Sequence, residues 1–218
     1  MNHRDRGAVR TSREELEHLH LAAGAILSDV PLRDVTVVDL PGGGAGRTMA
    51  DVRALLGSGK VEAASPVVRA LFALRWFLGR VFHWDTARAK QTEQSYVHRL
   101  GPEVETRSLV PPGSPDGPFR LLYLFDKESL AEIQNATVHA FLSTALVQTE
   151  LGYRLYWAVY VKPTSWLTPL YMAAIEPFRR FIVYPALLRR LRRAWKARYT
   201  AGGPSAASTA RTPRHRAP

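Results

Sequence analysis

Cysteine is absent from this 218-residue chain. A chain without cysteine forms no disulfide framework and no thiolate metal site, and its composition fits a reducing compartment. The first 20 residues, MNHRDRGAVRTSREELEHLH, also lack the apolar core of a secretory signal peptide. We therefore expect a cytoplasmic protein.

Acidic residues are absent from the C-terminal end. From Arg179 onward the chain has eleven basic residues and no acidic one, whereas the preceding 178 residues carry 19 of each sign. The formal net charge of +11 thus belongs entirely to this end. No nucleic-acid-reading motif accompanies it, and electrostatic attraction alone would give only nonspecific contact, so we expect no specific nucleic-acid partner.

The basic end has two open interpretations. A helix would place Leu188, Leu191 and Trp195 on one side, and Trp195 suits the depth of a membrane interface. The first interpretation is a weak peripheral contact with an anionic membrane surface, because each base near such a surface contributes about 1 kcal/mol. The second is a packed helix end with a solvated charged face. The residues assigned to the membrane contact are Arg189, Arg190, Arg192, Arg193, Trp195 and Lys196.

A long uncharged apolar run is missing as well. The most apolar helical segment, residues 65–82 (SPVVRALFALRWFLGRVF), contains Arg69, Arg75 and Arg80. Each arginine would cost about 2.5–3.5 kcal/mol near the centre of a bilayer. We therefore expect a helix buried against a sheet rather than a membrane span.

The glycine-rich segment PGGGAGRT, residues 41–48, follows the strand-like VTVVDL and precedes TMADVRALLG, which predicts a short helix ending at Gly57. A phosphate-binding P-loop reads G-x-x-x-x-G-K-[ST]. Aligned on Gly46, this chain has Pro41 in place of the first glycine and Arg47 in place of the lysine. Arg47 also occupies the third glycine position of a dinucleotide-binding pattern. We interpret the segment as a strand-to-helix connection, with nucleotide binding as a less favoured alternative and no cofactor expected.

The middle of the chain predicts mainly antiparallel strands. The segments QSYVHRL and FRLLYLFD are strand-like and flank a loop, VPPGSPDGP. Two long strands follow in TVHAFLSTALVQTELGYRLYWAVYV, with a turn at Glu150-Leu151-Gly152. Both faces of the second strand carry aromatic residues, so both should be covered. Glu132 and Asn135 are expected in the turn before this strand pair.

The two ends of this region predict helices and tails. REELEHLHLAAGAIL predicts a short helix, and an apolar stripe over residues 167–182 predicts a longer one that is kinked at Pro185. Residues 1–12 and 200–218 have the composition of disordered tails. We expect a single α+β domain over residues 13–199.

The C-terminal half resembles a known family. The strand pair and the stretch IEPFRRFIV, residues 175–183, are similar to an uncharacterised bacterial family, a domain of unknown function. The resemblance implies a START-like helix-grip fold, in the SRPBCC superfamily that includes polyketide cyclases and lipid-transfer domains. In that fold a curved antiparallel sheet wraps a long C-terminal helix and leaves a cavity between them. The resemblance transfers no catalytic residue.

Two functions follow as hypotheses. The first is the binding of a small apolar or amphipathic molecule, lipid-like or polyketide-like, in an internal cavity. The second is a cavity enzyme, such as a cyclase, dehydratase or hydrolase, which would need a polar pair within reach of proton transfer. His139 could move a proton but has no evident partner in the sequence, so we favour binding. His18 and His20 lack a third ligand, so no metal site is expected. The candidate cavity residues are Tyr123, His139, Phe141, Tyr156, Trp157, Tyr160, Ala174 and Phe178.

Overall fold

The computed structural model describes residues 9–10, 13–57, 95–134, 138–163, 172–173, 176–177 and 179–200. The helix expected over 65–82, most of the stripe over 167–182 and nearly all of both tails lie outside these residues. Within the described part of the chain, no helix combines the length and the apolar character needed to cross a membrane.

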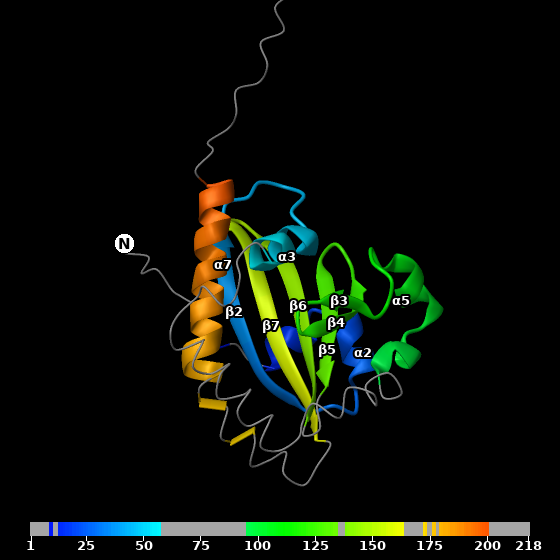
Figure 1. Ribbon diagram of the computed structural model, residues 1–218. Coiled ribbons are helices and arrows are strands. Elements are labelled where there is room, and N and C mark those ends of the chain that lie inside the picture. The colour runs from blue at the N-terminus through cyan, green and yellow to red at the C-terminus, as the bar shows by residue number, and fades with distance from the viewer. Residues whose placement is uncertain are drawn as a thin grey trace, which may run out of the picture.

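The described strands form one antiparallel, curved sheet (Figure 1). Their order across the sheet is β1-β2-β7-β6-β5-β4-β3, so β3 to β7 form a meander and β2 pairs with the last strand. The strands are β1 (Val9–Arg10), β2 (Leu32–Pro41), β3 (Ser114–Asp116), β4 (Phe119–Leu124), β5 (Glu128–Gln134), β6 (Val138–Thr149) and β7 (Gly152–Pro163). The expected strand over VTVVDL, the strand in FRLLYLFD and the long strand pair are confirmed.

Helices cover both faces of the sheet. In Figure 1, α7 and α3 lie in front of the strands, whereas α2 lies behind them. The described helices are α1 (Arg13–Glu17), α2 (Ala22–Ile26), α3 (Met49–Gly57), η3 (Tyr96–Arg99), α5 (Pro102–Arg107), the π-helical turn η4 (Arg179–Val183) and α7 (Tyr184–Tyr199).

The alternation of β7 assigns its side chains to two separate cores. Leu155, Trp157 and Val159 belong to a core shared with α3 and α7, here called the α7 face. Tyr156 and Ala158 point the other way and pack with Leu16 of α1, on what we call the α1–α2 face. The expectation that both faces of this strand are covered is therefore confirmed.

The inward side of α7 is part of the core. Leu188, Leu191 and Trp195 are at most 1% exposed, and the ring of Trp195 lies 5.7 Å from that of Tyr153 on β7. Pro185 stands in the first turn of α7, directly after the π-helical turn. The geometry of the helix therefore changes at this proline, which lacks the amide proton that a continuous helix would use.

The glycine-rich segment joins β2 to α3, as expected. Tyr153 fixes the position of this segment. The Tyr153 hydroxyl donates to the carbonyl of Gly44 at 2.8 Å and accepts from the amide of Arg47 at 3.1 Å. Arg47 Nε donates to the carbonyl of Gly43 at 2.7 Å, and its guanidinium lies 4.2 Å above the ring of Tyr199. The charged group that would have to reach a phosphate is thus bound to the loop and to the end of α7. The glycines with positive φ are Gly42, Gly43, Gly44 and Gly46.

Two local expectations are wrong. The strand expected in QSYVHRL is the 3-10 helix η3, because Ser95 caps it by accepting from the amide of Val97 at 3.3 Å. Glu132 is not in a turn but in β5, a strand that the sequence analysis did not predict.

Two further segments differ in detail from the expectation. The single helix expected at the start divides into α1 and α2 around His20, whose φ is +48°. The loop VPPGSPDGP contains β3, the short strand that ends the meander.

Candidate functional site

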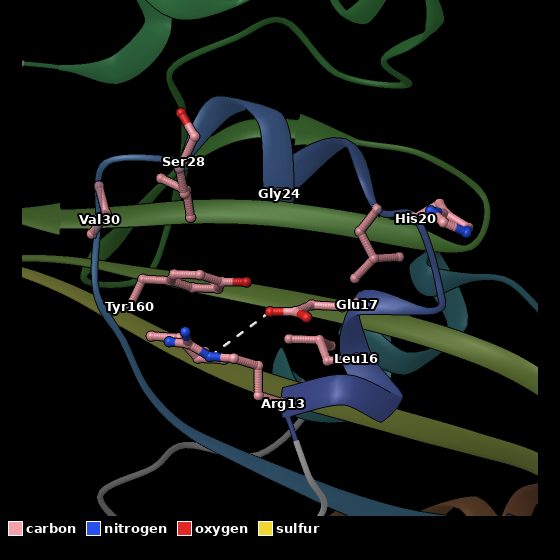
Figure 2. Close-up of a pocket in the computed structure, with 11 residues that line it drawn as sticks. Arg13, Leu16, Glu17, His20, Gly24, Ser28, Val30 and Tyr160 are labelled. Atoms are coloured by element: carbon pink, nitrogen blue, oxygen red, sulfur yellow. Dashed lines mark ion pairs between the residues drawn. The ribbon is translucent and has the colours of Figure 1, made fainter.

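A pocket of about 360 Å³ lies on the α1–α2 face (Figure 2). Its walls come from α1, from α2, from the chain that leads into β2, and from Tyr160 of β7. The lining combines five aliphatic residues with five polar or charged ones, which come from α1, from the segments on either side of α2 and from β7. The lining residues are Arg13, Leu16, Glu17, His20, Leu21, Gly24, Leu27, Ser28, Val30, Leu32 and Tyr160.

Tyr160 supplies a polar group at the sheet side of the pocket. Figure 2 shows its ring beneath α2, with the hydroxyl directed into the space between α1 and α2. Burial raises the pKa of Tyr160, so the hydroxyl keeps its proton at neutral pH and can donate a hydrogen bond. Within the described part of the chain, this hydroxyl makes no hydrogen bond.

A buried carboxylate on the sheet fixes the position of α2. Glu128 of β5 accepts from the backbone amides of Ala22 and Ala23 at 3.2 and 3.0 Å, which are the first amides of this short helix. The hydroxyl of Tyr123 donates to the same carboxylate. Burial and the charge of Glu128 raise the pKa of Tyr123 well above its usual value. This arrangement satisfies amide protons that a helix terminus leaves unpaired, and it holds the upper wall of the pocket against the sheet.

A second buried carboxylate connects β5, β6 and η3. Glu132 accepts from the hydroxyl of Ser95, from the backbone amide of Tyr96 at 3.0 Å and from Nε2 of His139 at 2.9 Å. The side chains of His139 and Glu132 are 3% and 5% exposed. Because an ionised carboxylate only accepts hydrogen bonds, Nε2 of His139 carries the proton in this contact.

These hydrogen bonds control the ionisation of Glu132. Burial by itself would raise the pKa of this carboxyl group, but the donors His139, Ser95 and the amide of Tyr96 outweigh burial. The pKa of Glu132 is therefore lower than usual, and the carboxylate is ionised at neutral pH.

The network continues from Tyr96 to the surface. The Tyr96 hydroxyl accepts from Nζ of Lys162 at 3.1 Å, and the guanidinium of Arg99 lies 3.8 Å above its ring. Arg99 in turn forms a bidentate ion pair with Asp29, which follows α2 in the chain. η3 is thus attached to the sheet on one side and to the end of α2 on the other.

Arg179, at the start of the π-helical turn η4, also has a buried partner in the sheet. Arg179 donates to Asp34 of β2 at 2.8 Å, and the side chain of Asp34 is only 4% exposed. The same guanidinium lies 5.5 Å from the ring centre of Tyr184. This ion pair ties the beginning of the C-terminal helical region to the first long strand.

Comparison with known proteins gives one match. The family model described as "Protein of unknown function (DUF2867)" matches residues 26–186, which is most of the chain. The chain belongs to the DUF2867 family. No curated protein and no solved structure matches it.

The DUF2867 segment contains only part of the pocket. It includes the wall from Leu27 to Leu32 and Tyr160, whereas the wall from Arg13 to Gly24 precedes it. The basic cluster of α7 follows it. The two charged groups at the pocket, Arg13 and Glu17, are therefore contributed by the N-terminal extension of the DUF2867 segment.

The structure brings together some of the candidate cavity residues. Tyr123 and Phe141 are buried in the core of the α1–α2 face, and Tyr160 packs against that core and lines the pocket. Tyr156 shares this face, and His139 lies 4.3 Å from Phe141 between ring centres. Trp157, in contrast, points into the α7 face. Ala174 and Phe178 lie outside the described residues.

Two features of the site were missed by the sequence analysis. The first is the carboxylate partner of His139, Glu132, which the sequence did not reveal. The alternation of ESLAEIQ, with Glu128, Leu130 and Glu132 on one face, is the signal that could have revealed the strand. The sequence carried no comparable sign that α1 and α2 would form part of a pocket.

His18 and His20 are both exposed, and no group of three potential metal ligands occurs among the described residues.

Proposed function

We propose that this protein binds one small apolar or amphipathic molecule in the pocket of the α1–α2 face. The observation that carries the proposal is a pocket of about 360 Å³ in which leucine and valine side chains stand beside polar groups. One of these polar groups, the Tyr160 hydroxyl, has no hydrogen-bond partner among the described residues. Small-molecule sites are typically concavities of about 300–1,000 Å³ with mostly apolar walls and a few polar groups. A molecule with an apolar body and a single polar end would match this lining.

The proposed fold is the START-like helix grip. An antiparallel sheet whose first long strand pairs with its last, together with a long C-terminal helix across one face, supports this assignment. The stretch at residues 175–183 supports it as well. A second cavity between the sheet and the first half of the C-terminal helix stays a prediction, because most of that half lies outside the described residues.

Binding is favoured over catalysis by the position of the polar pair. His139 and Glu132 are within reach of proton transfer from one to the other, but both side chains are almost fully buried. Glu132 already accepts three hydrogen bonds, and Ser95 bonds to Glu132 rather than to His139. Neither group lines the pocket, so the pair is better suited to holding η3 in place than to acting on a ligand.

Filling the pocket tests the proposal. A Cβ atom on Gly24 in α2 would meet nothing within 4 Å, so Gly24→Leu would place a side chain in the pocket without a backbone clash. Gly57→Leu, at the end of α3, is the matched control, since a Cβ there is equally unobstructed. We expect native mass spectrometry to detect a retained small molecule on the wild type and on Gly57→Leu, and not on Gly24→Leu. Equal retention by all three proteins would contradict a ligand in this pocket.

For the basic end, we propose a weak electrostatic contact with an anionic membrane. Arg189, Arg190 and Arg193 form no ion pair with any acid in the described part of the chain, and Arg189 and Arg193 are exposed. Trp195 is fully buried, so in the packed helix it cannot supply the interfacial anchor that the sequence suggested. The contact would therefore depend on charge alone and weaken as salt rises.

Liposome sedimentation tests this contact. We expect wild type to bind anionic but not zwitterionic vesicles, and the triple variant Arg189→Gln, Arg190→Gln, Arg193→Gln to lose most of that binding. Removal of the whole segment from residue 187 is unsuitable, because it would delete core residues of α7. Equal sedimentation of the wild type and the triple variant would leave these three arginines without a membrane role.

A further inference from the structure

We propose that the molecule held in this pocket carries an anionic group, a carboxylate in the simplest case, and that Tyr160 and Arg13 receive it together. This inference rests on the proposed function and names the chemistry of the polar end of the ligand. It follows from which groups at the pocket are already engaged and which are free to bind.

The first free donor is the Tyr160 hydroxyl. The other tyrosine hydroxyls on this face have protein partners, since Tyr123 donates to Glu128, Tyr156 donates to Glu15 and Tyr96 accepts from Lys162. Tyr160 has none among the described residues, although its ring is packed against two buried cores. The Tyr160 side chain is half-buried and its hydroxyl faces the pocket, so this group is available to donate a hydrogen bond to an acceptor on a ligand.

The second donor is the guanidinium of Arg13, which has only a weak contact with Glu17. Its side chain is 60% exposed, and its contact with Glu17 has an N–O distance of 3.9 Å, which is the outer limit of an ion pair. Exposed i,i+4 pairs of this kind contribute little to stability. The arginine can therefore exchange Glu17 for a ligand carboxylate at little cost. Figure 2 shows Arg13 next to Tyr160 on the same side of the pocket.

Electrostatic effects at Tyr160 agree with this geometry. After burial, the largest influence on its pKa is the positive charge of Arg13, ahead of the negative charges of Glu17 and Glu128. The hydroxyl thus experiences Arg13 more strongly than either acid. A carboxylate placed between Tyr160 and Arg13 would receive one hydrogen bond from a neutral donor and one from a charged donor, while its apolar part contacts Leu16, Leu27 and Val30.

Glu17 offers an alternative to this proposal, because its negative charge could receive a cationic ligand instead. If Glu17 were the receiving group, the pocket would prefer a cationic ligand of the same length. Isothermal titration of the full chain with decanoate, decanol and decylamine separates these cases, because the three probes share one alkyl chain. We expect decanoate to bind roughly tenfold more tightly than decanol, as a charge-assisted hydrogen bond in a partly solvated site would give. Decylamine should bind most weakly.

Two substitutions assign the effect to named atoms. Tyr160→Phe and Arg13→Gln should each weaken decanoate binding more than decanol binding, because the bonds that they remove are stronger to a charged acceptor than to a neutral one. Arg120→Gln is the charge-matched control, because Arg120 is exposed on β4 and does not line the pocket. Circular dichroism of each variant confirms that the fold is retained.

The outcomes distinguish the two levels of the proposal. If none of the three probes binds, the proposed function itself fails, and this inference fails with it. If decanoate and decanol bind equally and neither variant changes their ratio, the pocket binds apolar molecules but the carboxylate assignment is overturned. Tighter binding of decylamine than of decanoate would overturn it in favour of Glu17.

Discussion

Replacing Glu132 by glutamine should destabilise the protein without changing its shape. The carboxylate is 5% exposed and accepts hydrogen bonds from Ser95, Tyr96 and His139. Glutamine keeps one carbonyl oxygen but replaces the other with an amide group, which can only donate. At least one of the three donors therefore loses its acceptor inside the protein.

The size of the effect follows from this lost bond. A buried donor left without an acceptor costs about 1–3 kcal/mol in the free energy of unfolding. For a chain of this length, each kcal/mol lowers the melting temperature by about 2–4 °C. Glu105→Gln on α5 is the control, because that side chain is exposed and a surface change of this type should stay within about 0.5 kcal/mol.

The pH dependence gives an independent test of the same prediction. Because the folded protein lowers the pKa of Glu132, the carboxylate contributes stability that is fully present above the unfolded pKa, about 4.3 for glutamate. This contribution is lost as the pH falls through the folded pKa. The difference in unfolding free energy between wild type and Glu132→Gln should therefore shrink as the pH falls below the unfolded pKa of glutamate.

Urea titrations followed by circular dichroism at several pH values measure both quantities. The reasoning would be refuted by a variant that unfolds at the wild-type urea concentration at pH 7. A difference in unfolding free energy that persists unchanged below pH 4 would also refute it, because the ionised carboxylate would then not be its source.

Two further predictions concern backbone and core. Gly152 has a φ of +143°, and a Cβ atom there would lie 2.4 Å from the carbonyl oxygen of Leu40 and 2.6 Å from the amide nitrogen of Gly42. Gly152→Ala should therefore lower the free energy of unfolding by about 1–3 kcal/mol, as measured in urea titrations. A midpoint equal to that of the wild type would contradict the close approach of β7 to the end of β2. Trp195→Ala should cost about 3–5 kcal/mol because the ring is fully buried, whereas Arg189→Ala on the exposed side of α7 should change the midpoint little. Similar midpoints for these two variants would contradict the packing of α7 on the sheet.

The strands that the sequence predicted, β2, β4, β6 and β7, are rich in apolar residues, many of them β-branched or aromatic. A turn before Gly152 separates β6 from β7, so the pairing of these two strands followed from local pattern. β5 was missed because Glu128 and Glu132 occupy inward positions, where acidic residues suggest a turn. Their partners lie elsewhere in the chain: Glu128 bonds to α2, and Glu132 bonds to η3 and to His139.

The pocket could not be predicted for a related reason. Tyr160, on the sheet side of the pocket, was among the residues predicted from the sequence. The opposite walls come from α1 and α2, which are helices of five residues each. Helices this short have no amphipathic period to read, and α2 is positioned by Glu128, 106 positions away from Ala22. Only tertiary contacts decide that these helices lie over Tyr160.

The position of a bound probe decides whether the pocket of the α1–α2 face holds the ligand. Methyl NMR spectra of the full chain, recorded during titration with decanoate, report separately on the two faces of the sheet. Binding in the pocket should give saturable shifts of the methyl signals of Leu16, Leu27 and Val30, with the core signals of Leu188 and Leu191 on the α7 face unchanged. Shifts confined to the α7 face, or no saturable shift at all, would contradict ligand binding in the pocket beneath α1 and α2.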